Sequence, residues 1–167
     1  LYDENEETID FPYYVDEFNS NAGKRKCKKG LTEYVIKTGQ PLLVSSLVYI
    51  EMLERGEAET IGKPAIDWMG IPLKNAENKV IGGLVVQTYT EGNRYTQKDQ
   101  DILSFVSTQV AMVIERKRIE EALRESEEQY RAIVENSHDA IYIFSENRIV
   151  YANQNLCTLL KVTSKEI

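Results

Sequence analysis

The stretch that decides the fold is DWMGIPLKNAENKVIGGLVVQTY, residues 67–89. Two runs rich in β-forming residues, 67–74 and 79–89, flank the polar connection NAEN, and this arrangement predicts an antiparallel hairpin. The second run is almost continuously apolar from Val80 to Val86, which indicates that both of its faces are covered. We therefore expect a sheet with helices on one face and another layer on the other.

Short helices and strands are predicted ahead of this hairpin. Residues 31–38 carry apolar side chains at helical spacing, and Gly39 follows where such a helix would end. Similar patterns predict one further helix and two strands, at residues 46–55, 9–15 and 41–44. Residues 19–30, which hold a basic run, are predicted to be a loop.

A long helix is predicted to begin at Thr96, because Thr96 and Asp99 have the spacing of a capping box and no Pro or Gly follows them. Its apolar residues fall into two stripes. One stripe fits a helix packed on the domain: Ile102, Leu103, Val106, Val110, Val113 and Ile114. The other steps by four and three residues, which is the pattern of a coiled-coil seam: Phe105, Met112, Ile119, Leu123, Tyr130 and Ile133.

Polar residues interrupt this seam at Gln109, Arg116 and Ser126, and charges of both signs surround it. A solvated helix face explains the charges alone equally well. The apolar positions favour pairing with a second copy, since a lone polar helix of this kind is only marginally stable in water. We expect a homodimer formed through the helix at 96–135.

After Ser137 the pattern changes to a short β-rich block. Residues 140–144 and 148–151 predict two strands joined by a turn. Asn153 has the position of a helix cap, and a helix is predicted through Leu156, Leu159 and Leu160. Because this block stops before a core could close, we expect the chain to be part of a longer protein.

Composition and charge exclude several classes of function. The chain has 167 residues, a formal net charge of −7, one His and two Cys. The negative charge argues against general nucleic-acid binding, and one His with two distant Cys cannot form a closed metal shell. No apolar run is long enough to span a membrane, no signal peptide is visible and no disulfide framework exists, so we expect a cytoplasmic protein without membrane contact in this segment.

The first block resembles a GAF domain, a sensory module. The resemblance rests on five motifs in the family's order: FPYYVDE (11–17), GLTEYVIKTGQPLLV (30–44), DWMGIPLK (67–74), VIGGLVVQTY (80–89) and YTQKDQDILSFVSTQVAMVIERK (95–117). It implies an α+β fold, an antiparallel sheet with flanking helices, over residues 1–117. The family's opening helix and strand would precede Leu1, and without them an apolar flank would be exposed unless another chain covers it.

Residues 129–167 resemble the start of a PAS domain, on the motifs YRAIVENSHDAIYIF (130–144) and RIVYANQNLCTLL (148–160). This implies a truncated PAS-like β-hairpin and helix, joined to the first domain by a helical coiled-coil linker at 118–128. The connector is similar to those of multidomain sensor proteins, most often histidine kinases.

Two residues are candidates for chemistry, and neither is predicted to be catalytic. His138 lies in a predicted turn, without the motif of a kinase phosphoacceptor. Cys27 lies within the basic run RKCKK at 25–29, where nearby cations would lower the pKa of its thiol and raise its reactivity. A GAF-fold redox enzyme that uses Cys27 therefore stays open as an alternative function.

The resemblance places a ligand pocket against the sheet, beneath the segment corresponding to residues 42–66. Six residues are candidates for its lining: Tyr49, Met52, Leu53, Ile61, Ile66 and Trp68. An apolar lining with few polar groups suits a small molecule, and filling the core is the alternative role for the same residues. The sequence identifies no cofactor.

Together these interpretations predict a non-catalytic sensory and dimerisation segment of a signal-transduction protein. The resemblance points to a histidine kinase of a two-component phosphorelay as the parent protein. A cyclic-dinucleotide cyclase or phosphodiesterase is the alternative output. In either parent, the long helix would relay a change that begins at a small molecule in the GAF-like pocket.

Overall fold

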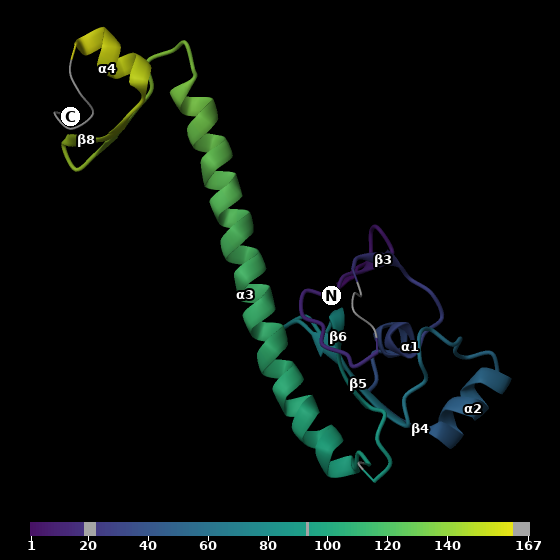
Figure 1. Ribbon diagram of the computed structural model, residues 1–167. Coiled ribbons are helices and arrows are strands. Elements are labelled where there is room, and N and C mark those ends of the chain that lie inside the picture. The colour runs from purple at the N-terminus through teal and green to yellow at the C-terminus, as the bar shows by residue number, and fades with distance from the viewer. Residues whose placement is uncertain (19–22, 93, 162–167) are drawn as a thin grey trace. The chain divides into compact units, whose positions relative to one another are not determined.

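The computed structural model describes residues 1–18, 23–92 and 94–161 (Figure 1). The chain divides into two compact units, Leu1–Glu115 and Arg116–Ile167. The predicted α+β class is confirmed: the structure has antiparallel sheets, a long helix and a C-terminal hairpin followed by a short helix.

The first unit is built around a three-stranded antiparallel sheet of order β4-β5-β6. Its strands are β4 (Leu42–Ser45), β5 (Asp67–Lys74) and β6 (Val80–Thr88). The predicted hairpin is β5–β6, and Asn75 closes its turn by accepting hydrogen bonds through Oδ1 from the amides of Glu77 (3.1 Å) and Lys79 (2.9 Å). Asn78 adopts a left-handed conformation, φ 63°, which Asn tolerates better than most residues.

The remaining short elements of this unit are β1 (Tyr2–Asp3), β2 (Thr8–Ile9), β3 (Arg25–Lys26), α1 (Leu31–Thr38) and α2 (Ser46–Glu54). The predicted helix at 31–38 is confirmed, and Gly39 ends it at φ 63° while donating its N–H to the Val35 carbonyl (2.9 Å).

Two predictions for the N-terminal part of the chain are wrong. The strand expected at 9–15 is only two residues long, because β2 ends at Ile9 and the following residues run along a cavity instead. Within the expected loop at 19–30, β3 pairs with β2, although residues 19–22 lie outside the described residues.

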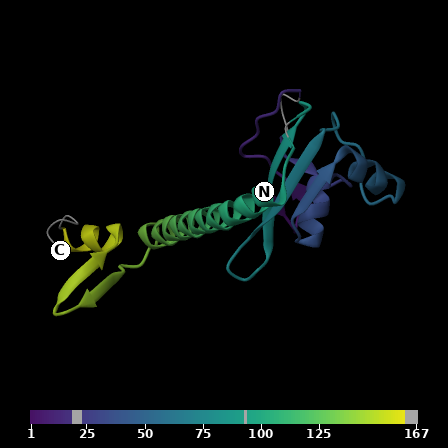
Figure 2. The ribbon, with the colours of Figure 1, turned by 90° about the horizontal axis from the view of Figure 1, so that it is seen from below.

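Helices cover both faces of the sheet, so the second layer that the sequence predicted is also a helix. On one face, Val35 of α1 is fully buried in a cluster with Val44 and Trp68. On the other face lies α3 (Gln97–Glu135), whose Ala111 is fully buried against Leu73. Figures 1 and 2 show α3 and α1 on opposite sides of β5 and β6.

The stripe of α3 that was predicted to face the domain is partly wrong. Ile102 and Val113 are 55% and 67% exposed, whereas Ser107 and Ala111 are buried. Val110 and Ile114 do pack against the sheet-side cluster, as predicted. Small side chains at the contact let the helix approach the sheet closely, so the buried face is rotated away from the largest apolar residues.

The second unit holds β7 (Tyr142–Ser145), β8 (Arg148–Ala152) and α4 (Gln154–Leu160), in agreement with the predicted hairpin and helix. Asn153 caps α4 by accepting a hydrogen bond from the Leu156 amide (3.1 Å). The same fully buried side chain donates to the Val134 and Asp139 carbonyls, at 3.0 and 2.9 Å. It therefore holds the end of α3, the hairpin and α4 together.

Candidate ligand-binding site

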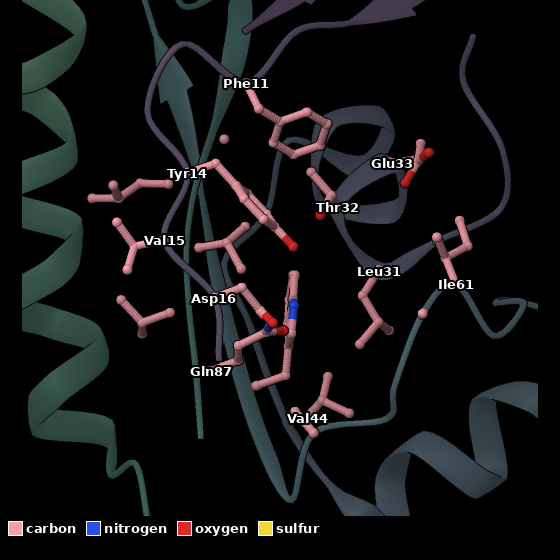
Figure 3. A pocket seen from close by; sticks show the side chains of 18 of the residues that line it. Phe11, Tyr14, Val15, Asp16, Leu31, Thr32, Glu33, Val44, Ile61 and Gln87 are labelled. Atoms are coloured by element: carbon pink, nitrogen blue, oxygen red, sulfur yellow. The ribbon is translucent and has the colours of Figure 1, made fainter. Parts of the chain in front are cut away.

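A cavity of about 820 Å³ lies in the first unit (Figure 3). The strands contribute Val44, Trp68 and Gln87 to its lining, and the first turn of α1 contributes Leu31, Thr32 and Glu33. Two irregular segments, 11–16 and 59–65, supply further lining residues, and Val110 and Ile114 line it from α3. A cavity of this size suits a small-molecule ligand.

Trp68 lies across the backbone of Gly70 at the cavity. A Cβ atom built on Gly70 would lie 2.7 Å from Trp68 Cζ3, which is closer than real Cβ contacts allow. Trp68 is 6% exposed. Tyr49 also lines the cavity, and its hydroxyl donates a hydrogen bond to Thr60 Oγ1 (3.2 Å). The absence of a side chain at Gly70 is thus what lets the indole pack flat on the sheet.

A polar cluster at one side of the cavity consists of Asp16, Gln87 and Tyr89. Tyr89 donates its hydroxyl to Asp16 Oδ2 (2.9 Å), and Gln87 Nε2 donates to Tyr89 Oη (2.8 Å) and to Asp16 Oδ2. Burial, together with the Asp16 hydrogen bond, raises the pKa of Tyr89 to about 12. Figure 3 shows Asp16 beside Gln87, although the two are 71 positions apart in sequence.

Next to this cluster, the Lys63 ammonium lies 3.2 Å from the centroid of the Phe18 ring and 5.4 Å from that of Tyr89. The two rings meet edge to face, 4.6 Å apart. This lysine therefore makes a cation–π contact at the edge of the cavity.

A second charged cluster surrounds Glu33 near the start of α1. Its Oε1 atom accepts hydrogen bonds from Arg25 Nη1 (2.5 Å) and from the Lys28 amide (3.0 Å). Burial alone would raise the pKa of Glu33, but these two hydrogen bonds, together with the nearby Glu33 backbone amide and the charge of Arg25, outweigh it and lower the pKa below its ordinary value. Glu33 is therefore an ionised carboxylate in a largely buried position.

The six residues predicted to line a pocket fall into three groups. Tyr49, Ile61 and Trp68 line the cavity. Met52 is buried in the hydrophobic cluster behind it, with Leu53 packed against that cluster. Ile66 does not line the cavity and donates its backbone N–H to the Thr88 carbonyl (2.8 Å). The polar lining residues Asp16, Glu33 and Gln87 were not predicted.

Cys27 does not have the environment that its basic neighbours suggested. Burial raises the pKa of its thiol, and the Glu33 carboxylate raises it further, which outweighs the lowering by Arg25 and Lys26. The neighbouring lysines are also occupied, because Lys24 forms an ion pair with Glu6 and Lys26 Nζ donates to the Glu6 carbonyl. The expectation of an activated thiol is therefore wrong in direction.

His138 lies in a turn between α3 and β7, is exposed, and accepts a hydrogen bond through its carbonyl from Asn155.

Among the residues that the structure describes, no group of three or more His, Cys, Asp or Glu side chains could hold a metal ion. Within the same residues, no helix combines the length and apolar character that crossing a bilayer requires.

A second candidate functional surface lies on α3 and is called the seam here. All six apolar side chains that the sequence assigned to it are between 51% and 70% exposed: Phe105, Met112, Ile119, Leu123, Tyr130 and Ile133. In the first unit, Phe105 and Met112 lie roughly 100–120° around the helix axis from Ala111, off the side that packs on the sheet. Arg116, a polar position within the seam, forms an ion pair with Glu120 (2.7 Å), and Arg124 beside the seam pairs with Glu121 (2.6 Å).

Comparison with protein families confirms the resemblance to a GAF domain followed by a PAS domain. A GAF domain model matches residues 1–115, and a PAS domain model matches residues 128–167. No curated protein matches the chain. Both families are sensory signalling domains. The chain therefore belongs to the GAF domain family, and its GAF domain is followed by a PAS-type domain.

Proposed function

We propose that this chain is the sensory and dimerising segment of a signal-transduction protein, and that the parent is a histidine kinase of a two-component phosphorelay. In this proposal the GAF cavity binds a small molecule, the seam pairs two copies, and α3 carries the signal. The segment itself performs no catalysis.

The exposed seam is the observation that carries the proposal. A helix whose apolar side chains lie on more than one face can bury only one of these faces on its own sheet. A heptad spacing over nearly 30 residues matches what a second helix of the same kind would cover. Pairing two copies would remove these side chains from water and stabilise the polar part of α3.

The cavity and the seam share α3, which is why we propose a relay. Val110 and Ile114 line the cavity, while Met112 lies on the seam between them in sequence. A ligand shifts the helix pair only if it binds two arrangements of the pair unequally. The polar seam positions Gln109, Arg116 and Ser126 keep the pairing weak enough for two arrangements to be populated.

Sedimentation of matched leucine variants tests the dimer. Arg116→Leu places an apolar side chain in the seam and should tighten dimerisation about tenfold or more. Arg118→Leu makes the same change of charge and side chain on a different face of α3 and should leave the monomer–dimer balance unchanged. Equal behaviour of the two variants would show that the seam is not the interface.

The kinase output is tested on the parent protein. With ATP, a histidine kinase forms an acid-labile phosphohistidine, and this product should appear on a histidine outside residues 1–167. Mass spectrometry of molecules that copurify with the native protein tests the sensing role. Failure to detect phosphohistidine in a protein that still dimerises would remove the kinase assignment and leave the sensory one.

A further inference from the structure

One buried charge in the GAF domain is not satisfied by the fold. Glu33 is only 7% exposed, and its Oε1 atom is paired with Arg25 and the Lys28 amide. Its Oε2 atom is buried and accepts no hydrogen bond from any described residue. Buried carboxylate oxygens nearly always have a donor, because leaving one without a donor costs the full desolvation energy.

Arg25 does not supply the second hydrogen bond. Its guanidinium also donates to the Lys26 carbonyl (3.2 Å) and lies 5.7 Å from the centroid of the Phe11 ring. These contacts hold it on the Oε1 side of the carboxylate. A donor for Oε2 must therefore come from elsewhere.

The space beside Oε2 exists because residue 30 is glycine. A Cβ atom on Gly30 would lie 2.7 Å from Glu33 Oε2 and 2.7 Å from Ile61 Cδ1. Gly30, Glu33 and Ile61 all line the cavity, and Figure 3 shows Glu33 and Ile61 on the same side of it. A ligand that displaces the Ile61 methyl group would reach this oxygen.

The rest of the lining favours a flat, electron-poor or cationic group. Aromatic side chains contribute Phe11, Tyr14 and Trp68, and a second carboxylate comes from Asp16. The two lining cations, Arg25 and Lys63, already contact Glu33 and the Phe18 ring. Aromatic faces and carboxylates both attract protonated nitrogen groups.

We propose that Glu33 is a ligand-binding residue whose Oε2 atom accepts a hydrogen bond from the N–H of a planar organic cation, an aromatic amidine or amine. The proposal rests on the proposed sensing role of the same cavity and names the ligand's chemical class. It assigns Arg25 the role of competing cation, since the guanidinium neutralises the carboxylate that the ligand would use.

Benzamidine, benzamide and benzoate form a matched set of probes, because they share a ring and differ in charge. Trp68 is the single tryptophan of the chain and lines the cavity, so its fluorescence reports binding directly. Benzamidine should bind the full chain about tenfold or more tighter than benzamide, and benzoate should bind weakest. Equal affinity for benzamidine and benzamide would overturn the proposal even if every variant failed to fold.

Two variants separate recognition from support of the fold. Glu33→Gln should weaken benzamidine binding about tenfold, whereas Arg25→Gln should strengthen it, because the competing cation is gone. If Glu33 only anchors the preceding loop, both variants lower the melting temperature and neither changes the preference for benzamidine. That result would overturn the proposal.

The failure of this proposal and the failure of the sensing function give different results. A neutral or anionic molecule that copurifies with the protein and quenches Trp68 would refute the cationic class and leave sensing intact. Absence of any cavity ligand, with none of the three probes bound, would refute both. Sedimentation of the same samples measures the monomer–dimer balance, and so tests dimerisation through the seam independently of ligand binding.

Discussion

At the scale of single residues, Gly70 and Trp68 form one unit of the sheet. The indole occupies the space where a side chain of residue 70 would project, so Gly70→Ala must displace it. We expect a loss of about 1–3 kcal/mol of unfolding free energy, as for other overpacked cores, and a red shift of the Trp68 fluorescence as the ring becomes more exposed.

Gly83→Ala is the matched control for this prediction. It lies on β6, where a Cβ atom would meet only ordinary contacts, the nearest being the Ile71 carbonyl oxygen at 3.7 Å. Its unfolding free energy should stay within about 0.5 kcal/mol of the parent. An unchanged fluorescence spectrum in Gly70→Ala would contradict the described position of the indole.

Tyr89 gives the GAF domain a specific alkaline sensitivity. Its pKa is raised from 10.0 to about 12, so the folded chain keeps the phenol proton that the unfolded chain loses above pH 10. This contribution to stability is complete below pH 10 and is lost as the pH rises towards 12. Tyr89→Phe removes it, so the difference in melting temperature between parent and variant should shrink over this window.

Tyrosinate absorbance provides the direct measurement. The chain has ten tyrosines, and the difference spectrum between parent and Tyr89→Phe isolates one of them. That difference should titrate near pH 12, while a midpoint near the ordinary value of 10.0 would show that Tyr89 is neither buried nor hydrogen-bonded to Asp16.

Local signals at residue scale were predictable and long-range ones were not. The helix end at Gly39 and the capping box of Thr96 and Asp99 each depend on residues that are close together in the sequence. The structure has both features. The contact between Asp16 and Gln87 joins distant parts of the chain. No short-range pattern encodes it, so the polar half of the cavity could not be read from the sequence.

At the scale of elements, the orientation of α3 is the feature that periodicity left undecided. Apolar residues occur on nearly every side of the helix between 102 and 114. From the sequence pattern alone, the larger apolar side chains are predicted to be buried. The sheet instead receives Ser107 and Ala111, because contact with a flat β surface favours small residues. The seam pattern was clearer, since beyond residue 116 only one apolar stripe remains.

Leucine substitutions test this orientation. Ala111 is fully buried against Leu73 and Ile81, so Ala111→Leu should cost about 1–3 kcal/mol of unfolding free energy. Val113→Leu, on a side of α3 that is 67% exposed, should change it by less than about 0.5 kcal/mol. Chemical denaturation of the GAF domain measures both, and the opposite ranking would mean that the helix is rotated.

At the scale of the whole molecule, dimerisation and ligand binding are two equilibria that share α3. Each dimer would hold two cavities. If dimerisation changes the affinity of each cavity by some factor, thermodynamic linkage requires two bound ligands to change the dimerisation constant by the square of that factor. The proposed relay therefore predicts a quantitative relation between two separate measurements.

The benzamidine affinity is measured at protein concentrations well below and well above the dimer dissociation constant. The ratio of the two affinities is the factor by which dimerisation changes ligand binding. Sedimentation with and without saturating benzamidine gives the factor by which the ligand changes the dimerisation constant. We expect this factor to equal the square of the affinity ratio. Ile119→Asp, which places a charge in the seam, should fix the affinity at the monomer value at every protein concentration. If benzamidine binds but neither quantity changes, the ligand has equal affinity for the monomer and the dimer, and a relay that acts through dimerisation is contradicted, because such a ligand cannot shift the monomer–dimer populations.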